Sequence, residues 1–284
     1  MTVALVTDST AYLPEELIAR HGIVVVPLHV SADDVQYTEG VDLDEADLLR
    51  LLKRSRRLTT SRPSPRAFYD VYERLASQGV REIVSVHLSA ELSGTYDAAT
   101  LAARQASVPV HVVDSGSMGM TLGHAVLTAV DRAEQGATGE EVAQAATARA
   151  RAGGLLFYVH TLEFLRRGGR IGNAAAFLGS ALAVRPLLSL DQGRIEPVEK
   201  VRTTARALAR LVDLAGDFAS ERNEPVAVTV HHLQDEERAQ RLAAALEERL
   251  GAAVADEVAV RPIGAVAAVH LGPGAMAVSL SPTA

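Results

Sequence analysis

The sequence lacks cysteine and tryptophan, and it has only two lysines among 284 residues. Without cysteine the chain has no disulfide, no thiol nucleophile and no thiolate ligand for a metal. A Schiff-base enzyme or an ATPase with a Walker motif needs a well-placed lysine, and only Lys53 and Lys200 are available. These absences disfavour several large classes of enzyme on composition alone.

The chain also lacks an excess of positive charge and a long apolar segment. Its net charge is −7, so it has no general electrostatic attraction for nucleic acid or an anionic membrane. The longest nearly pure apolar stretch is AAAFLGSALAV (174–184), far shorter than the roughly 20 residues that cross a bilayer. The N-terminus, MTVALVTDST, does not resemble a signal peptide. We therefore expect a soluble, cytoplasmic protein without nucleic-acid partners or stable membrane insertion.

The first half of the chain alternates short apolar runs with helical patterns. Pro14 precedes one helical segment and Gly22 follows it, which is the usual order of these two residues. The runs are rich in β-branched residues and hardly alternate with polar ones: TVALV (2–6), IVVVPLHV (23–30), EIVSV (82–86) and PVHVV (109–113). Such runs are typical of parallel strands that are covered on both faces. We predict an α/β domain with an open parallel sheet over residues 1–153.

Residues 154–284 follow a different pattern. The segment PLLSLDQGRIEPVEKVRT (186–203) contains two runs around the turn-like tetrapeptide Asp-Gln-Gly-Arg, which predicts a hairpin. A helix (204–219), a strand (225–232), a helix opened by Asp235 and two further strands in DEVAVRPIG and AMAVSLS follow. This pattern predicts a second domain of the α+β class, with a mixed or antiparallel sheet.

Polar residues gather where the predicted strands of the first half end. The segments are TDST (7–10), HLSAELSGT (87–95), DSGS (114–117) and the hydroxyl-rich LTTSRPSP (58–65). Helix capping would explain each segment alone. Because the carboxyl ends of parallel strands meet at one edge of the sheet, four such loops together favour a ligand site there.

Ser93 lies at one of these strand-to-helix transitions, beside Gly94. A nucleophile elbow needs Gly-x-Ser-x-Gly, but Glu91 stands at the first glycine position. A hydroxyl next to backbone N–H groups at a helix start suits an anion, so Ser93 and Gly94 predict a clamp for a carboxylate or phosphate. The apolar helix predicted over NAAAFLGSALAV (173–184) would either meet the ligand or belong to the core. No metal site and no cofactor motif is predicted.

Seven motifs together resemble those of the DegV family of bacterial fatty-acid-binding proteins, in that family's order and over nearly the whole chain. They are TDSTAYLP, TSRPSP, LSGTYDAA, VVDSGSMGMTLG, LEFLRRGGRIG, EKVRT and HLGPGAMAV. The resemblance implies an α/β domain and an α+β domain with a long-chain fatty acid buried between them. It also implies, as in the branch called FakB, that the fatty acid is presented to a separate ATP-dependent, FakA-like kinase. That kinase phosphorylates the carboxylate to an acyl phosphate for phospholipid synthesis.

The same resemblance implies roles for individual residues. Ser93, with the N–H of Gly94, would bind the carboxylate, and two further residues would support it, Thr60 and His270. Arg170 and Arg202 match arginines that engage the kinase. No catalytic residue, metal or cofactor is implied. The chain departs from the family pattern twice, with Arg62 where glutamine is common and Tyr12 where an acidic residue is common.

Two other functions remain open at this stage. One is a serine hydrolase of lipid esters that uses Ser93 and a histidine. The other is a phospho-ligand-binding regulatory protein that holds no lipid. The leading hypothesis is a fatty acid carrier that is not itself an enzyme. Burial of the acyl chain would contribute about 0.8 kcal/mol per methylene. Donors must receive the carboxylate, because burying it unpaired is very unfavourable.

Overall fold

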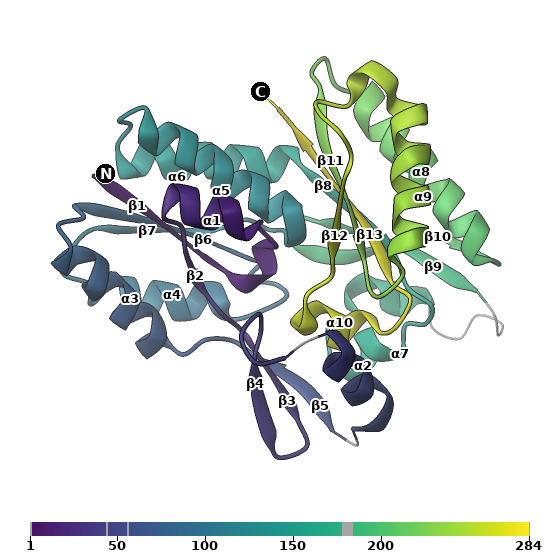
Figure 1. The fold of residues 1–284 in the computed structure, drawn as a ribbon, viewed down its shortest axis with the longest axis horizontal. Helices are drawn as coiled ribbons and strands as arrows, with labels where there is room; N and C mark the ends of the chain where they lie inside the picture. The colour runs from purple at the N-terminus through teal and green to yellow at the C-terminus, as the bar shows by residue number, and fades with distance from the viewer. Residues whose placement is uncertain (1, 44, 56, 178–183, 284) are drawn as a thin grey trace.

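The computed structural model describes residues 2–43, 45–55, 57–177 and 184–283, and their strands form three sheets (Figure 1). The first sheet is parallel, with the order β2-β1-β6-β7, and it confirms the α/β prediction for the first half. Its strands are β1 (Val3–Asp8), β2 (Val24–Val26), β6 (Glu82–His87) and β7 (Val110–Asp114). Every residue of β1 is buried, which explains why this run does not alternate.

Helices cover both faces of the parallel sheet. One face is covered by α3 (Pro65–Ser77) and α4 (Thr95–Ala103), and the other by α5 (Gly119–Glu134) and α6 (Gly139–Ala152) (Figure 1). A short 3-10 helix, η1 (Ser9–Ala11), follows β1 directly. Helix α1 (Glu15–His21) then begins after Pro14 and ends at Gly22, whose φ is 62°. These boundaries confirm the start and end signals in the sequence.

The second sheet has six strands, in the order β10-β9-β8-β13-β11-β12, and all of them follow residue 153. Neighbouring strands are antiparallel except β11 and β12, so the sheet is mixed, as predicted. The strands are β8 (Gly154–Tyr158), β9 (Arg185–Asp191), β10 (Arg194–Val201), β11 (Val226–His232), β12 (Ala259–Pro262) and β13 (Met276–Pro282). The predicted hairpin is confirmed as β9–β10, with Gln192 and Gly193 at φ 46° and 82° in its turn. The division into domains at 153/154 remains a prediction.

The two faces of the six-stranded sheet belong to different cores. Helices α8 (Thr204–Ser220) and α9 (Glu236–Leu250) pack on one face. Along β8, Tyr158 points into the core beneath these helices, whereas Leu155 and Phe157 join the core that the sheet shares with the parallel sheet. This alternation, with a period of two residues, turns one face of β8 toward the first half of the chain.

A small third sheet was missed by the sequence analysis. It is antiparallel, with the order β4-β3-β5, and consists of β3 (His29–Ala32), β4 (Val35–Thr38) and β5 (Leu58–Ser61). Two predictions were therefore wrong. The run 23–30 is not one strand, because Pro27 lacks an N–H group and separates β2 from β3, which lie in different sheets. Residues 58–61 are a strand and not a loop of the parallel sheet.

Short helices complete the described chain. Helix α10 (Ala265–Leu271) lies beside the third sheet, and α2 (Glu45–Arg54) and α7 (Glu163–Arg167) both pack against α10. The helix predicted over 173–184 begins as a 3-10 helix, η2 (Gly172–Phe177), and residues 178–183 lie outside the described part. A last 3-10 turn, η3 (Gly251–Ala253), follows α9. Within the described ranges, no helix is long and apolar enough to span a membrane.

Candidate functional site

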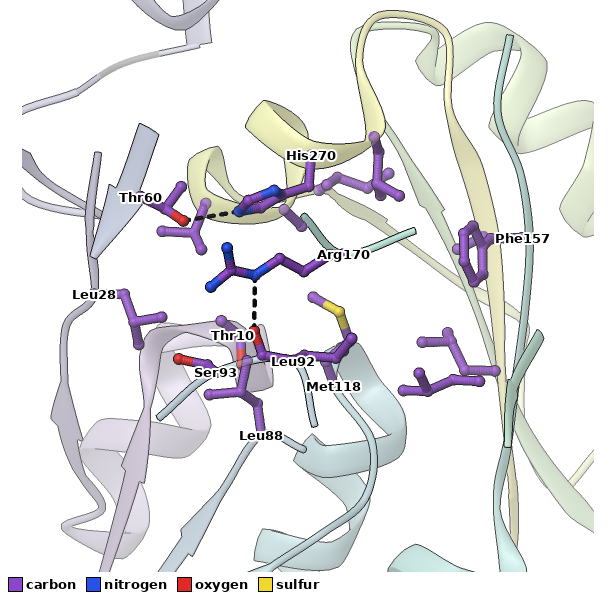
Figure 2. Close-up of a pocket in the computed structure, with 18 of the residues that line it drawn as sticks. Thr10, Leu28, Thr60, Leu88, Leu92, Ser93, Met118, Phe157, Arg170 and His270 are labelled. Carbon is purple, nitrogen blue, oxygen red and sulfur yellow. Dashed lines mark hydrogen bonds between the residues drawn. The ribbon is translucent and has the colours of Figure 1, made fainter. Parts of the chain in front are cut away.

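Residues from both halves of the chain line one cavity (Figure 2). Most of the lining side chains are apolar, among them Leu28, Leu88, Met118, Phe157 and Leu190. In Figure 2 the side chains of Thr60, Ser93, Arg170 and His270 lie toward one end, with Leu28 and Leu88 beside them, and Phe157 lies away from them. The cavity therefore has a polar end and an apolar body, which suits a ligand with an apolar chain and a polar head.

At the polar end, two segments from opposite parts of the sequence meet. Thr60 Oγ1 on β5 and His270 Nε2 on α10 lie 2.8 Å apart. Burial, and secondly the charge of Arg170, lowers the pKa of His270 to about 4, so the imidazole is neutral at pH 7. The ring lies close against Gly168, because a Cβ on that residue would stand 2.0 Å from His270 Nδ1. This pair can exchange hydrogen bonds with a bound head group without adding charge.

Two guanidinium groups contact the backbone on either side of Ser93 in the chain. Arg170 Nε donates to the carbonyl of Leu92 at 3.1 Å, and Arg62 Nη1 donates to the carbonyl of Gly94 at 2.9 Å. The Ser93 hydroxyl itself lies 2.9 Å from the hydroxyl of Thr95, the first residue of α4. The first N–H groups of a helix have no partner within it, so the start of α4 offers free donors next to Ser93 in the chain.

A buried polar network supports the floor of this site. The carboxylate of Asp8, at the end of β1, accepts hydrogen bonds from the backbone N–H and hydroxyl of Thr10 at 3.0 and 2.6 Å. Its other oxygen accepts from Leu88 N at 3.0 Å and from His87 Nδ1 at 3.0 Å. Thr10 and Leu88 both line the cavity, so Asp8 fixes two segments of its wall at once.

The network continues away from the cavity as a chain of buried side chains. His87 donates through Nδ1 to Asp8, so its Nε2 accepts from the Ser85 hydroxyl at 2.7 Å. The Tyr72 hydroxyl in turn donates to Ser85 at 2.8 Å. Sequence reasoning placed Asp8 and His87 at strand ends but did not pair them. The signal in the sequence was that both residues end predicted strands of one parallel sheet, whose carboxyl ends share one edge. In the structure these strands, β1 and β6, are neighbours.

The structure brings four of the six predicted site residues to the cavity wall. These are Thr60, Ser93, Arg170 and His270. Gly94 lies immediately beside them as the N-cap of α4. Arg202 is exposed and does not line the cavity. The roles of all six remain predictions.

Tyr12 marks the boundary with a second cleft, which sequence reasoning did not find. Tyr12 and Ile263 line both the cavity and this second cleft, whose wall also includes Glu39. The Tyr12 backbone has φ 52°, and its ring meets that of His231 edge-on at 5.7 Å between centroids. Burial, and secondly the charge of Glu39, raises the pKa of Tyr12 well above its usual value, so the phenol stays neutral.

Glu39 connects the third sheet to the helix that carries His270. Its Oε2 accepts a 2.5 Å hydrogen bond from the Ser9 hydroxyl, and its Oε1 accepts one of 2.8 Å from Val266 N in α10. Burial raises the pKa of this carboxyl. Glu39 thus anchors α10, and through that helix it helps to fix the position of His270.

The geometry offers little for covalent or metal chemistry. The Ser93 hydroxyl pairs with Thr95, and within the described ranges no histidine forms a hydrogen bond to it. A serine nucleophile needs an adjacent base, although such contacts can tighten only when substrate binds. Among the residues that the structure describes, no group of three or more His, Asp or Glu side chains could hold a metal ion.

Comparison with known proteins gives full-length matches. The family model for an uncharacterised protein of the DegV family matches residues 2–283. A DegV domain-containing protein of Streptomyces coelicolor is 51% identical over 279 residues, which cover 98% of each chain. The structure of a fatty-acid-binding DegV family protein from Thermus thermophilus has 34% identity and a TM-score of 0.90, with all of both chains covered. DegV of Bacillus subtilis, a fatty-acid-binding protein, has 32% identity and a TM-score of 0.89, again over all of both chains.

Proposed function

This chain belongs to the DegV family, and we propose that it binds a long-chain fatty acid in the cavity between its sheets. The carboxylate would lie at Ser93, Thr60 and His270, and the acyl chain would extend along the apolar wall toward Phe157. The observation that carries the proposal is this separation of one polar end from an apolar body. Fatty acid binding by the relatives from Thermus thermophilus and Bacillus subtilis supports it.

The two parts of the ligand would be held by different forces. Burial of the acyl chain contributes about 0.8 kcal/mol per methylene, of which association and ordering consume a large part. The carboxylate contributes little affinity unless donors replace its water, because an unpaired buried charge is very unfavourable. The hydroxyls of Ser93 and Thr60 and the N–H of Gly94 would supply those donors, and the neutral His270 would support them through its hydrogen bond with Thr60.

We further propose that the bound fatty acid is presented to a separate ATP-dependent, FakA-like kinase, which would form the acyl phosphate. The resemblance of the motifs that contain Arg170 and Arg202 supports this step. Arg202 is exposed and can meet a partner directly. Arg170 lines the cavity, so it would meet a partner only at the mouth, beside the head group. In this scheme the chain is the substrate-presenting subunit, with its two domains divided at residue 153/154.

Extraction of purified protein with organic solvent, followed by mass spectrometry, tests the proposed function. We expect a stoichiometric free fatty acid from the native protein and much less from Ser93→Ala. Ser107→Ala is the matched control, because Ser107 is exposed and lies outside the cavity wall. A native protein that is empty and also fails to take up added fatty acid would contradict the proposal. Labelling of Ser93 by a fluorophosphonate, with turnover of lipid esters, would instead support the hydrolase.

A further inference from the structure

The polar end of the cavity contains more positive charge than a carboxylate requires. Arg62 and Arg170 both line it, and their guanidinium groups donate to the carbonyls of Gly94 and Leu92, the two residues that flank Ser93 in the chain. Figure 2 shows the Arg170 guanidinium between the Thr60–His270 pair and Ser93. A fatty acid carboxylate has one negative charge, and these arginines supply two positive ones.

No acidic side chain in the described part of the chain forms a salt bridge with either arginine. Glu91, the acidic residue nearest to Ser93 in sequence, pairs with Arg194 at 3.0 Å. The partners of Arg62 and Arg170 are backbone carbonyls, which carry no formal charge. His270 does not change this balance, because its lowered pKa of about 4 keeps it neutral at pH 7.

The position of Arg62 depends on the glycine after Ser93. A Cβ on Gly94 would lie 2.5 Å from Arg62 Nη1 and 3.2 Å from its Cδ and Cζ, so the side chain rests directly against the Gly94 backbone. Arg62 is exposed, whereas Arg170 is half-buried. One lining cation is therefore half-buried and the other exposed, and both contact carbonyls next to Ser93 in the chain.

We propose that Arg62 and Arg170 form a phosphate subsite around Ser93, so that this protein binds a phosphate-headed lipid more tightly than the corresponding fatty acid. The inference rests on the proposed lipid-binding function. A phosphate group has close to two negative charges and three acceptor oxygens, enough to contact both guanidinium groups. The planar fork of arginine suits such contacts. An uncharged glutamine at position 62 would leave only the half-buried cation, Arg170, at this site.

Titration of delipidated protein with three probes tests the subsite: palmitate, hexadecyl phosphate and inorganic phosphate. The variants are Arg62→Gln, Arg62→Lys and, as a matched control, Arg66→Gln, since Arg66 is exposed and pairs with Asp70. We expect Arg62→Gln to lower the affinity for hexadecyl phosphate about tenfold or more, and the affinity for palmitate about threefold or less. Arg62→Lys should retain part of the affinity for hexadecyl phosphate, and Arg66→Gln all of it.

The possible results separate this inference from the proposed function. Equal affinity of Arg62→Gln and native protein for hexadecyl phosphate, with palmitate still bound, overturns the subsite and leaves fatty acid binding intact. If inorganic phosphate binds as tightly as hexadecyl phosphate, the alkyl chain adds no affinity. That result overturns a lipid as the ligand of the subsite. Binding of hexadecyl phosphate without palmitate supports the subsite and contradicts the proposed fatty acid. If neither lipid binds, both proposals fail.

Discussion

Thr60 and His270 lie within hydrogen-bond distance, 2.8 Å between Oγ1 and Nε2, although 210 positions separate them in the sequence. The pair joins the third sheet to α10 at the polar end of the cavity. Each side chain thus holds the other in place for a head group. The proposed carboxylate site consequently depends on contacts between residues that are far apart along the chain.

Thr60→Val tests this pair, because valine keeps the shape of threonine and removes its hydroxyl. We expect fatty acid affinity to fall about tenfold, the effect of losing a hydrogen bond to a charged group. Thr59→Val is the control, since Thr59 is the exposed neighbour on β5 and its side chain points to the opposite face. The measurement is titration of delipidated protein, and equal losses in both variants would count against the role of Thr60.

Tyr12→Ala should alter which chain lengths the cavity accepts. Tyr12 and Ile263 line both the cavity and the second cleft, so removing the ring should widen the cavity toward that cleft. We expect the preferred length in a series of saturated fatty acids to increase. Tyr12→Phe keeps the wall and should show the native preference. An unchanged length profile for Tyr12→Ala would show that the acyl chain does not reach this wall.

Asp8→Ala should destabilise the fold and weaken binding together. The substitution removes the acceptor for His87, Thr10 and the backbone N–H of Leu88, all within a fully buried network. We expect the free energy of unfolding to fall by about 3 kcal/mol or more, because several buried donors lose their acceptor and each costs about 1–3 kcal/mol. Asp256→Ala, in an exposed loop, should change it by about 0.5 kcal/mol or less. Urea denaturation of the three proteins gives the comparison.

The stability of the fold should decrease in mild acid because of buried histidines. Burial lowers the pKa of His231 to about 3, and that of His124 and His270 to about 4, against 6.5 in the unfolded chain. Between pH 6.5 and 4 the unfolded chain binds more protons, so the free energy of unfolding falls as the pH falls. Each pKa unit of displacement corresponds to about 1.4 kcal/mol.

Urea denaturation across this pH range checks the effect. His231→Asn, whose side chain does not titrate, should show a shallower dependence of the free energy of unfolding on pH than the native protein. Glu39 acts in the opposite direction, because its raised pKa favours the folded state at lower pH, and it is present in both proteins. The difference between the two curves therefore isolates His231. Two parallel curves would mean that His231 does not bind a proton on unfolding.

The parallel sheet and the β9–β10 hairpin could be predicted from the sequence because buried runs and turn residues are local signals. The third sheet could not be, because β4 reads VQYT, half exposed and weakly apolar, and Pro27 stands inside an apolar run. Thr60 was consequently placed on a loop of the wrong sheet, although its presence at the site was expected. That expectation came from family resemblance and not from periodicity.

Other parts of the site depend on contacts that no local pattern encodes. The approach of Arg62 to Gly94 joins two segments of the chain that sequence reasoning treated separately. The role of Gly168 depends on where α10 places the ring of His270. Tyr12 could be noted as a departure from the family, but only the two cavities on either side of it show what its ring does.

The position of β13 has a consequence for biosynthesis. This strand, Met276–Pro282, pairs with β8 on one side and β11 on the other, so it lies inside the six-stranded sheet although every other strand of that sheet is translated before it. Until residue 282 leaves the ribosome, β8 and β11 have unpaired edges. The cavity wall that includes Ala277 does not exist until then. A nascent chain stalled before Met276 would therefore lack this part of the cavity wall, and its open strand edges would favour aggregation.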